Sequence, residues 1–212
     1  NNCAFGTNAA TNVTTSAFNN AFGQEALEAT TTGSNNNAYG YNALTTNTTG
    51  ANCSAFGHEA LKTNNSSDNN AFGVYALRES TGTNNSAFGS YSLRQNTSGS
   101  GNTACGNYAL NANTTASNNT AMGYLSLDTN TTGSGNTAMG ANALQSLTTG
   151  GSNTAIGNFA MDAATTASSS VAVGRNALTA MTTGSSNVCM GDNSGNSITT
   201  NSDNTIIGSL AG

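Results

Sequence analysis

The sequence predicts an all-β fold, a parallel β-solenoid of thirteen rungs with about 17 residues in each rung. A motif recurs along the chain, so that residues 136–152 read NTAMGANALQSLTTGGS and residues 153–169 read NTAIGNFAMDAATTASS. Proline is absent, as expected where strand residues donate backbone hydrogen bonds to their neighbours. Phe, Leu, Ile and Val make only 28 of the 212 residues and charged residues only 6%, so the composition fits neither a conventional core nor a disordered chain.

One array of repeats covers residues 1–212 without a linker, and we expect it to be a segment of a longer fibre. An invariant glycine marks each copy, and the spacing is 17 residues except in two copies of 16, residues 53–68 and 69–84. A copy is too short for the helix pair of a helical repeat, which needs about 34 residues, and Gly, Asn and Thr are weak helix formers. The glycines are Gly6, Gly23, Gly40, Gly57, Gly73, Gly89, Gly106, Gly123, Gly140, Gly157, Gly174, Gly191 and Gly208.

The positions of a copy, numbered from the Asn of NTAMG, each suit a solenoid. Asn at position 1 tolerates a left-handed turn and can stack its amides in a ladder. Position 3 is Ala in eleven copies, position 4 is always apolar or aromatic, and Gly at position 5 permits a bend that a Cβ would prevent. Thr at positions 13 and 14 suits a half-exposed strand. Rungs about 4.8 Å apart would make a rod of roughly 60 Å.

Two columns of large side chains, at positions 4 and 9, are expected to fill the interior. Because neighbours in a strand point to opposite faces, Ala at position 3 would then face outward and be covered by another chain. In the alternative, the glycine at position 5 redirects the backbone and the Ala columns of positions 3 and 8 line one core. The predicted core columns contain Phe22, Phe56, Phe72, Phe88, Met122 and Met139 at position 4, and Leu27, Leu44, Leu61, Leu110, Leu144 and Leu178 at position 9.

Candidate binding residues lie on the expected outer surface, where all the charges fall outside positions 3, 4, 8 and 9. Three tyrosines share position 7 and three cations share position 10 on neighbouring rungs, a pattern suited to stacking on sugars and holding acidic glycans. This predicted glycan-contact ladder is Tyr75, Tyr91, Tyr108, Lys62, Arg78 and Arg94. Sequons at position 12 predict N-glycosylation, in a eukaryotic secretory source, at Asn47, Asn96, Asn113 and Asn130.

Several functional classes find no support in the sequence. His58 is the only histidine and has no implied Ser or Cys partner, so we predict no enzyme and no catalytic residue. The four cysteines lack metal-ligand spacing, so we predict no metal and no cofactor. The net charge of −5 gives no basic face for nucleic acid, and no apolar run approaches the about 18 residues of a membrane span.

Copies such as NTAMGYLSLDTNTTGSG, residues 119–135, resemble the NTAxGxxALxxNTTGxx arrays of phage-type tail-fibre-domain proteins. They are also similar to the head repeats of trimeric autotransporter adhesins, the YadA-like left-handed β-roll. The resemblance implies a left-handed solenoid in a structural, adhesive or scaffolding fibre on a virion or cell surface or outside the cell. It also implies self-association as a trimer, and open sheet edges would allow an end-to-end filament instead. The alternative function is ice binding through the Thr rows or glycan binding through the Tyr and Arg ladder.

Overall fold

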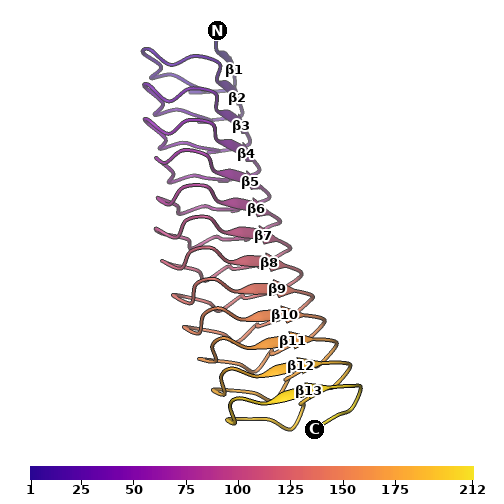
Figure 1. Ribbon diagram of the computed structural model, residues 1–212. Coiled ribbons are helices and arrows are strands. Elements are labelled where there is room, and N and C mark those ends of the chain that lie inside the picture. Colours follow the sequence, from indigo (N-terminus) through magenta and orange to yellow (C-terminus); the bar gives the residue numbers. More distant parts are fainter.

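The computed structural model describes all residues 1–212 as a parallel β-solenoid, which confirms the predicted fold class. Thirteen three-residue strands, one per rung, form a single parallel sheet in chain order along one side of a rod (Figure 1). The strands are β1 Cys3–Phe5, β2 Asn20–Phe22, β3 Asn37–Tyr39, β4 Ser54–Phe56, β5 Asn70–Phe72, β6 Ser86–Phe88, β7 Thr103–Cys105, β8 Thr120–Met122, β9 Thr137–Met139, β10 Thr154–Ile156, β11 Val171–Val173, β12 Val188–Met190 and β13 Thr205–Ile207.

The register places equivalent positions of successive copies directly opposite one another. Between β9 and β10, for example, Ala138 pairs with Ala155 and Met139 with Ile156. Only 24 of the 135 backbone hydrogen bonds lie within the strands, and many of the others join the turns of adjacent rungs. The stacking therefore extends around the whole coil rather than along the sheet alone.

The backbone turns sharply after each strand. Gly140 at position 5 has a φ of +135°, and an added Cβ would lie 2.5 Å from the carbonyl oxygen of Gly157 in the next rung. Only glycine fits this bend without a clash against backbone. Positions 7 and 9 then adopt left-handed conformations, as Asn142 does with φ 59° and Leu144 with φ 52°. The two left-handed residues turn the leucine of position 9 back into the interior, where it is fully buried.

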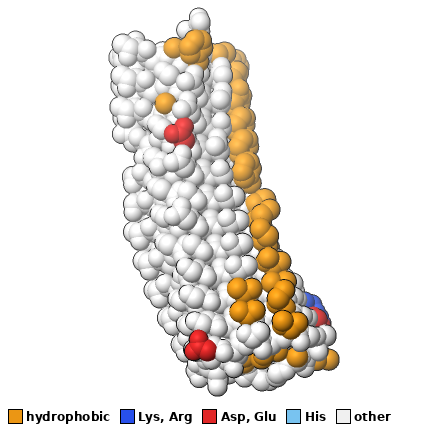
Figure 2. Space-filling model, viewed as in Figure 1, with side chains coloured by type: hydrophobic (Ala, Val, Ile, Leu, Met, Phe, Trp, Pro, Cys, Tyr) orange, Lys and Arg blue, Asp and Glu red, His pale blue; other side chains and the backbone are white.

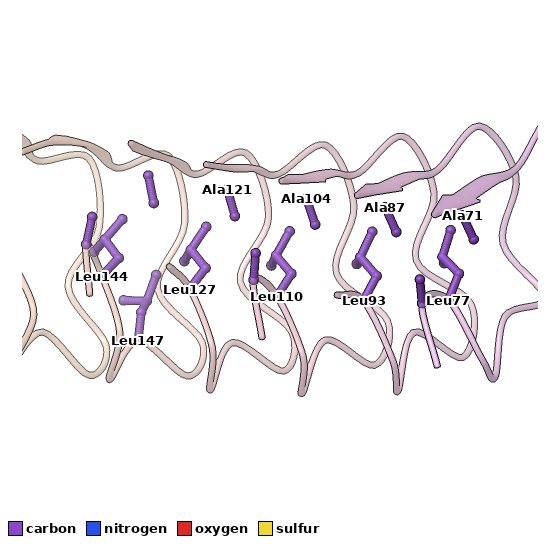
Figure 3. Close-up of a cluster of buried hydrophobic side chains, with 14 of the residues drawn as sticks. Ala71, Leu77, Ala87, Leu93, Ala104, Leu110, Ala121, Leu127, Leu144 and Leu147 are labelled. Atoms are coloured by element: carbon purple, nitrogen blue, oxygen red, sulfur yellow. The ribbon is translucent and has the colours of Figure 1, made fainter. Parts of the chain in front are cut away.

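The core is built from Ala at positions 3 and 8 and Leu at position 9, and it runs without a break along the rod. Figure 3 shows the strand alanines pointing toward the leucine series, with Ala87 and Ala104 above Leu93 and Leu110. Every leucine predicted for the core is fully buried: Leu27, Leu44, Leu61, Leu110, Leu144 and Leu178.

The expectation that position 4 also lies inside is wrong. Because position 3 points inward, position 4 must point outward from the same strand. Phe72 and Phe88 are 37% and 42% exposed, Met122 and Met139 are 44% and 37% exposed, and Phe22 and Phe56 are half-buried on the same outer face. The alternative arrangement, with both Ala columns lining one core, is the one that the structure has.

Buried asparagines at positions 1 and 12 bind backbone groups within each rung and between rungs. Asn36 at position 1 donates from Nδ2 to the carbonyl oxygen of Gly50 at 2.8 Å, and its Oδ1 accepts the backbone N–H of Cys53 in the next rung at 2.9 Å. A second amide, that of Asn47 at position 12, donates to the same Gly50 carbonyl at 3.0 Å. Each buried backbone group thus gains a partner that the strand ladder does not supply.

No helix in the structure has the length and hydropathy needed to cross a membrane.

Candidate functional site

The four predicted glycosylation sites lie inside the rod. Position 12 faces the core, where Leu147 and Met181 replace the asparagine in two later rungs. The amides of this column also donate to the carbonyl at position 15, as Asn96 does to Gly99 at 2.8 Å. The glycosylation prediction is therefore wrong for the folded rod, because a fully buried amide cannot carry a glycan. The buried asparagines are Asn47, Asn96, Asn113 and Asn130.

An exposed apolar stripe follows the outer face of the sheet. Figure 2 shows apolar side chains as a nearly continuous band along the side of the rod where the strands lie. The aromatic rings stack, with centroids of Phe56 and Phe72 4.7 Å apart and their planes 6° from parallel. The stripe consists of the position 4 residues Phe5, Phe22, Tyr39, Phe56, Phe72, Phe88, Cys105, Met122, Met139, Ile156, Val173, Met190 and Ile207.

A charged cluster occupies rungs 4 to 6, where three of the four Lys and Arg residues lie. Glu59 is its centre: Oε1 accepts Lys62 Nζ at 2.8 Å and Oε2 accepts Arg78 Nε at 2.6 Å. Arg78 also donates from Nη1 to Glu79 at 2.6 Å. Burial disfavours the charged form of Glu59, but the hydrogen bonds from Lys62 and Arg78 outweigh it and lower the pKa to about 2. Arg94 has no ion pair, and its buried Nε has no hydrogen-bond partner.

The structure brings the six residues of the predicted glycan-contact ladder into this one region. The Arg94 guanidinium lies 5.9 Å from the centroid of the Tyr75 ring and 5.6 Å from that of Tyr91. Tyr91 and Tyr108 stack at 4.8 Å, and Tyr75 and Tyr91 approach at 5.3 Å. The faces of Tyr91 are thus occupied by the neighbouring rings and by Arg94. Tyr91 therefore offers a ligand its ring edge and hydroxyl rather than a free face.

An open hollow of about 360 Å³ lies beside the charged cluster. Its lining residues are Thr63, Glu79, Thr81 and Thr97, from rungs 4, 5 and 6. Glu79 belongs to both features, because its carboxylate is held by Arg78. Sequence reasoning did not predict this hollow, although the two 16-residue copies, which lie at the same rungs, were a signal for it.

The two threonine positions differ in what they present to solvent. At position 13 the hydroxyl donates to the next rung, as Thr114 Oγ1 does to the carbonyl oxygen of Thr131 at 2.9 Å. At position 14 the side chain is exposed, as in Thr115 and Thr132. The outer surface therefore carries one exposed row of threonines, which is narrower than the broad regular array that ordering ice would require.

The histidine and the four cysteines do not come together in one site. His58 is exposed; it stacks on Tyr41 and meets Tyr75 edge to face, with ring centroids 5.2 Å away in both pairs. No three His, Cys, Asp or Glu side chains lie close enough together to hold a metal ion. Cys53 and Cys189 are buried thiols, whereas Cys3 and Cys105 are exposed on the outer face of the sheet.

Comparison of the chain with known proteins gives no relative: no protein-family model, no curated protein and no solved structure matches it.

Proposed function

We propose that the chain is a structural module of an extracellular fibre or filament, with an adhesive or scaffolding role and no catalytic activity. Copies of the rod associate side by side through the apolar stripe. The observation that carries the proposal is the stripe itself, which runs along all thirteen strands, with the mostly polar side chains of position 2 beside it and no charged residue in any strand. The extracellular setting follows the resemblance to tail-fibre and adhesin repeats.

The size of the stripe supports an interface. Six of its members, including Phe88, Met122 and Ile156, are between 37% and 44% exposed. With about 200 Å² for each large apolar side chain, the thirteen rungs expose on the order of 800–1,000 Å². The largest apolar patch of a typical monomer is about 300–600 Å², and a standard interface buries about 800 Å² on each partner.

The spacing of the stripe favours a second copy as the partner. Its side chains repeat about every 4.8 Å along the rod, and an identical rod matches that spacing over its full length. The stripe is aromatic from Phe5 to Phe88 and aliphatic or thioether from Met122 to Ile207. A parallel, in-register arrangement places rings against rings, and aromatic pairs contribute about 0.5–1.5 kcal/mol beyond the area they bury. We therefore propose parallel association.

Sedimentation velocity on the full chain tests the association. We expect an oligomer for the unsubstituted chain. When Phe72, Phe88, Met122 and Met139 are all replaced by Thr, we expect a folded monomer that melts at a lower temperature, because the stacking of Phe72 and Phe88 within the chain is also lost. A control chain with Thr115, Thr132, Thr149 and Thr166 replaced by Ser should remain oligomeric. A monomeric unsubstituted chain at high micromolar concentration would contradict the proposal.

Disulfide trapping tests the orientation. Cys105 lies in the stripe on rung 7 of thirteen, so oxidation should join Cys105 of two copies in either orientation. Met190→Cys on rung 12 distinguishes them, since two such residues meet only in a parallel pair. In a Cys105→Ser background, cross-linking of Met190→Cys supports parallel association, and cross-linking only between Met190→Cys and Phe22→Cys chains contradicts it.

A further inference from the structure

The hollow beside the charged cluster exists because two successive rungs each lack one residue. In rung 3, Asn47 Nδ2 donates to the carbonyl oxygen three residues later, that of Gly50. In rung 4 the equivalent bond, from Asn64 Nδ2, reaches Ser66, only two residues later. The deleted residue is thus at position 14, the position that carries the exposed threonine row in full-length rungs.

The missing residue leaves the neighbouring threonines of position 13 more exposed than in most other rungs. Position 13 is half-buried in most full-length rungs, as at Thr48 and Thr114, but Thr81 and Thr97 beside the gap are exposed. These two threonines, together with Thr63 and Glu79, line the hollow of about 360 Å³. This volume lies within the range of small-molecule sites, about 300–1,000 Å³.

The lining presents hydrogen-bond acceptors and no free donor. The hydroxyls of Thr63, Thr81 and Thr97 donate their single protons to the backbone carbonyls of Arg78, Thr97 and Thr114, at 2.9, 2.6 and 2.9 Å respectively. The backbone N–H groups of all four lining residues are also bonded within the rod. What remains for a ligand is threonine oxygen lone pairs, threonine methyl groups and the Glu79 carboxylate, which accepts only.

Glu79 is a fixed acceptor rather than a mobile surface carboxylate. Its Oε1 accepts Arg78 Nη1 at 2.6 Å, while Arg78 Nε is held by Glu59 at 2.6 Å. Its Oε2 has no protein partner, and the side chain is 45% exposed. Arg78, which Glu79 shares with Glu59, offsets part of the charge of this carboxylate. The cluster of Glu59, Lys62, Arg78, Glu79 and Arg94 carries a net positive charge, with three cations and two acids.

We propose that this hollow binds one neutral sugar unit. Adjacent sugar hydroxyls donate to Glu79 Oε2 and to the threonine oxygens, and the C–H face of the ring packs on the threonine methyls. The surplus positive charge disfavours a cationic ligand, and a lining without donors disfavours an anionic one. The site lies at positions 11 to 13, away from the position 4 stripe, so it does not depend on the proposed association.

Saturation-transfer difference NMR with the full chain tests this site, using glucose, galactose and mannose as probes, with spermidine and N-acetylneuraminate as the charged comparisons. We expect at least one hexose to bind and the charged probes not to compete. Glu79→Ala should weaken binding about tenfold or more, because a hydrogen bond to a charged group is lost.

Insertion of one Thr between Thr81 and Gly82 is the matched variant, because it restores the 17-residue rung and fills the hollow without changing a lining residue. We expect it to abolish hexose binding. Absence of binding by all three hexoses, undiminished binding by both variants, or binding of spermidine or N-acetylneuraminate alone would overturn the proposal. If the insertion variant does not fold, Glu79→Ala decides the outcome by itself. Loss of oligomerisation with hexose binding retained would contradict only the proposed fibre association.

Discussion

The side-chain Nδ2 of Asn136 donates to the carbonyl oxygen of Gly150 at 2.9 Å within the same rung. Its Oδ1 also accepts the backbone N–H of Asn153 in the next rung at 3.0 Å. One buried amide thus pairs two backbone groups that no other group of the rod reaches. Asn recurs at position 1 because its side chain can pair these two backbone groups at once.

Asn136→Ala should therefore destabilise the rod by about 2–6 kcal/mol, because two buried backbone groups lose their partners at about 1–3 kcal/mol each. Chemical denaturation of the variant measures this. Thr149→Ala, a change in the exposed row, is the control and should leave stability nearly unchanged. Equal stabilities of the two variants would show that the amide does not pair these groups.

Cys53 is a natural interruption of the same ladder. Its thiol faces the backbone N–H of Asn69 in the next rung, and sulfur is a weak acceptor, whereas the amide oxygen of Asn36 in the rung before accepts the N–H of Cys53 at 2.9 Å. Cys53→Asn should replace this weak contact with an amide hydrogen bond and stabilise the chain by about 1 kcal/mol. Thermal unfolding of Cys53→Asn and of Cys53→Ala measures the gain. A Cys53→Asn chain no more stable than Cys53→Ala would argue against it.

Gly140→Ala should be among the most damaging single substitutions. The added Cβ would lie 2.5 Å from the Gly157 carbonyl oxygen at a φ of +135°, so we expect a loss of about 3 kcal/mol or more. Gly135→Ala is the control, since its φ is +72° and its Cβ would meet nothing closer than 3.7 Å. Comparison of the two denaturation midpoints measures the difference, and similar midpoints would refute the proposed clash.

The charged cluster should make the stability of the rod depend on pH in the acid range. The folded pKa of Glu59 is lowered to about 2, so its ion pairs stabilise the rod fully above the unfolded pKa of about 4.3 and the contribution is lost as the pH falls toward 2. The melting temperature of Glu59→Gln should be lower than that of the unsubstituted chain at pH 7, and the difference should shrink through this window. A difference that is constant from pH 7 to 2 would contradict the assignment.

Much of the fold could be predicted because each rung of a solenoid repeats the same residue types at the same positions, so the repeat length of the sequence gives the length of one rung. The register between Ala138 and Ala155 follows directly from the 17-residue spacing. Position 4 was wrongly predicted to face the core because it carries the largest apolar side chains, which usually lie inside a protein. The interior of each rung is filled by two alanines, one leucine and the residues of positions 1 and 12, so Phe72 and Met122 had to face outward.

Other features left weaker signals. Leu147 stands at position 12, where Asn130 stands one rung earlier, and an apolar residue in that column was a sign that the sequons are buried. The left-handed backbone of Leu144 and Leu127 could not be inferred, because leucine has no preference for that conformation. The neighbouring placement of Lys62, Arg78 and Arg94 followed from their shared position, but the pairing of Lys62 and Arg78 with Glu59 required the folded turns.

The central claim is that equivalent residues lie directly over one another along the rod, and pulsed electron spin resonance tests it most directly. In a chain whose exposed Cys3 and Cys105 are replaced by Ser, spin labels at Thr115 and Thr200, both exposed and 85 residues or five rungs apart, should give one narrow distance of about 24 Å. Labelled chains diluted with unlabelled ones restrict the measurement to pairs within one chain. A broad distribution, or a mean distance far from this value, would contradict the stacked rod.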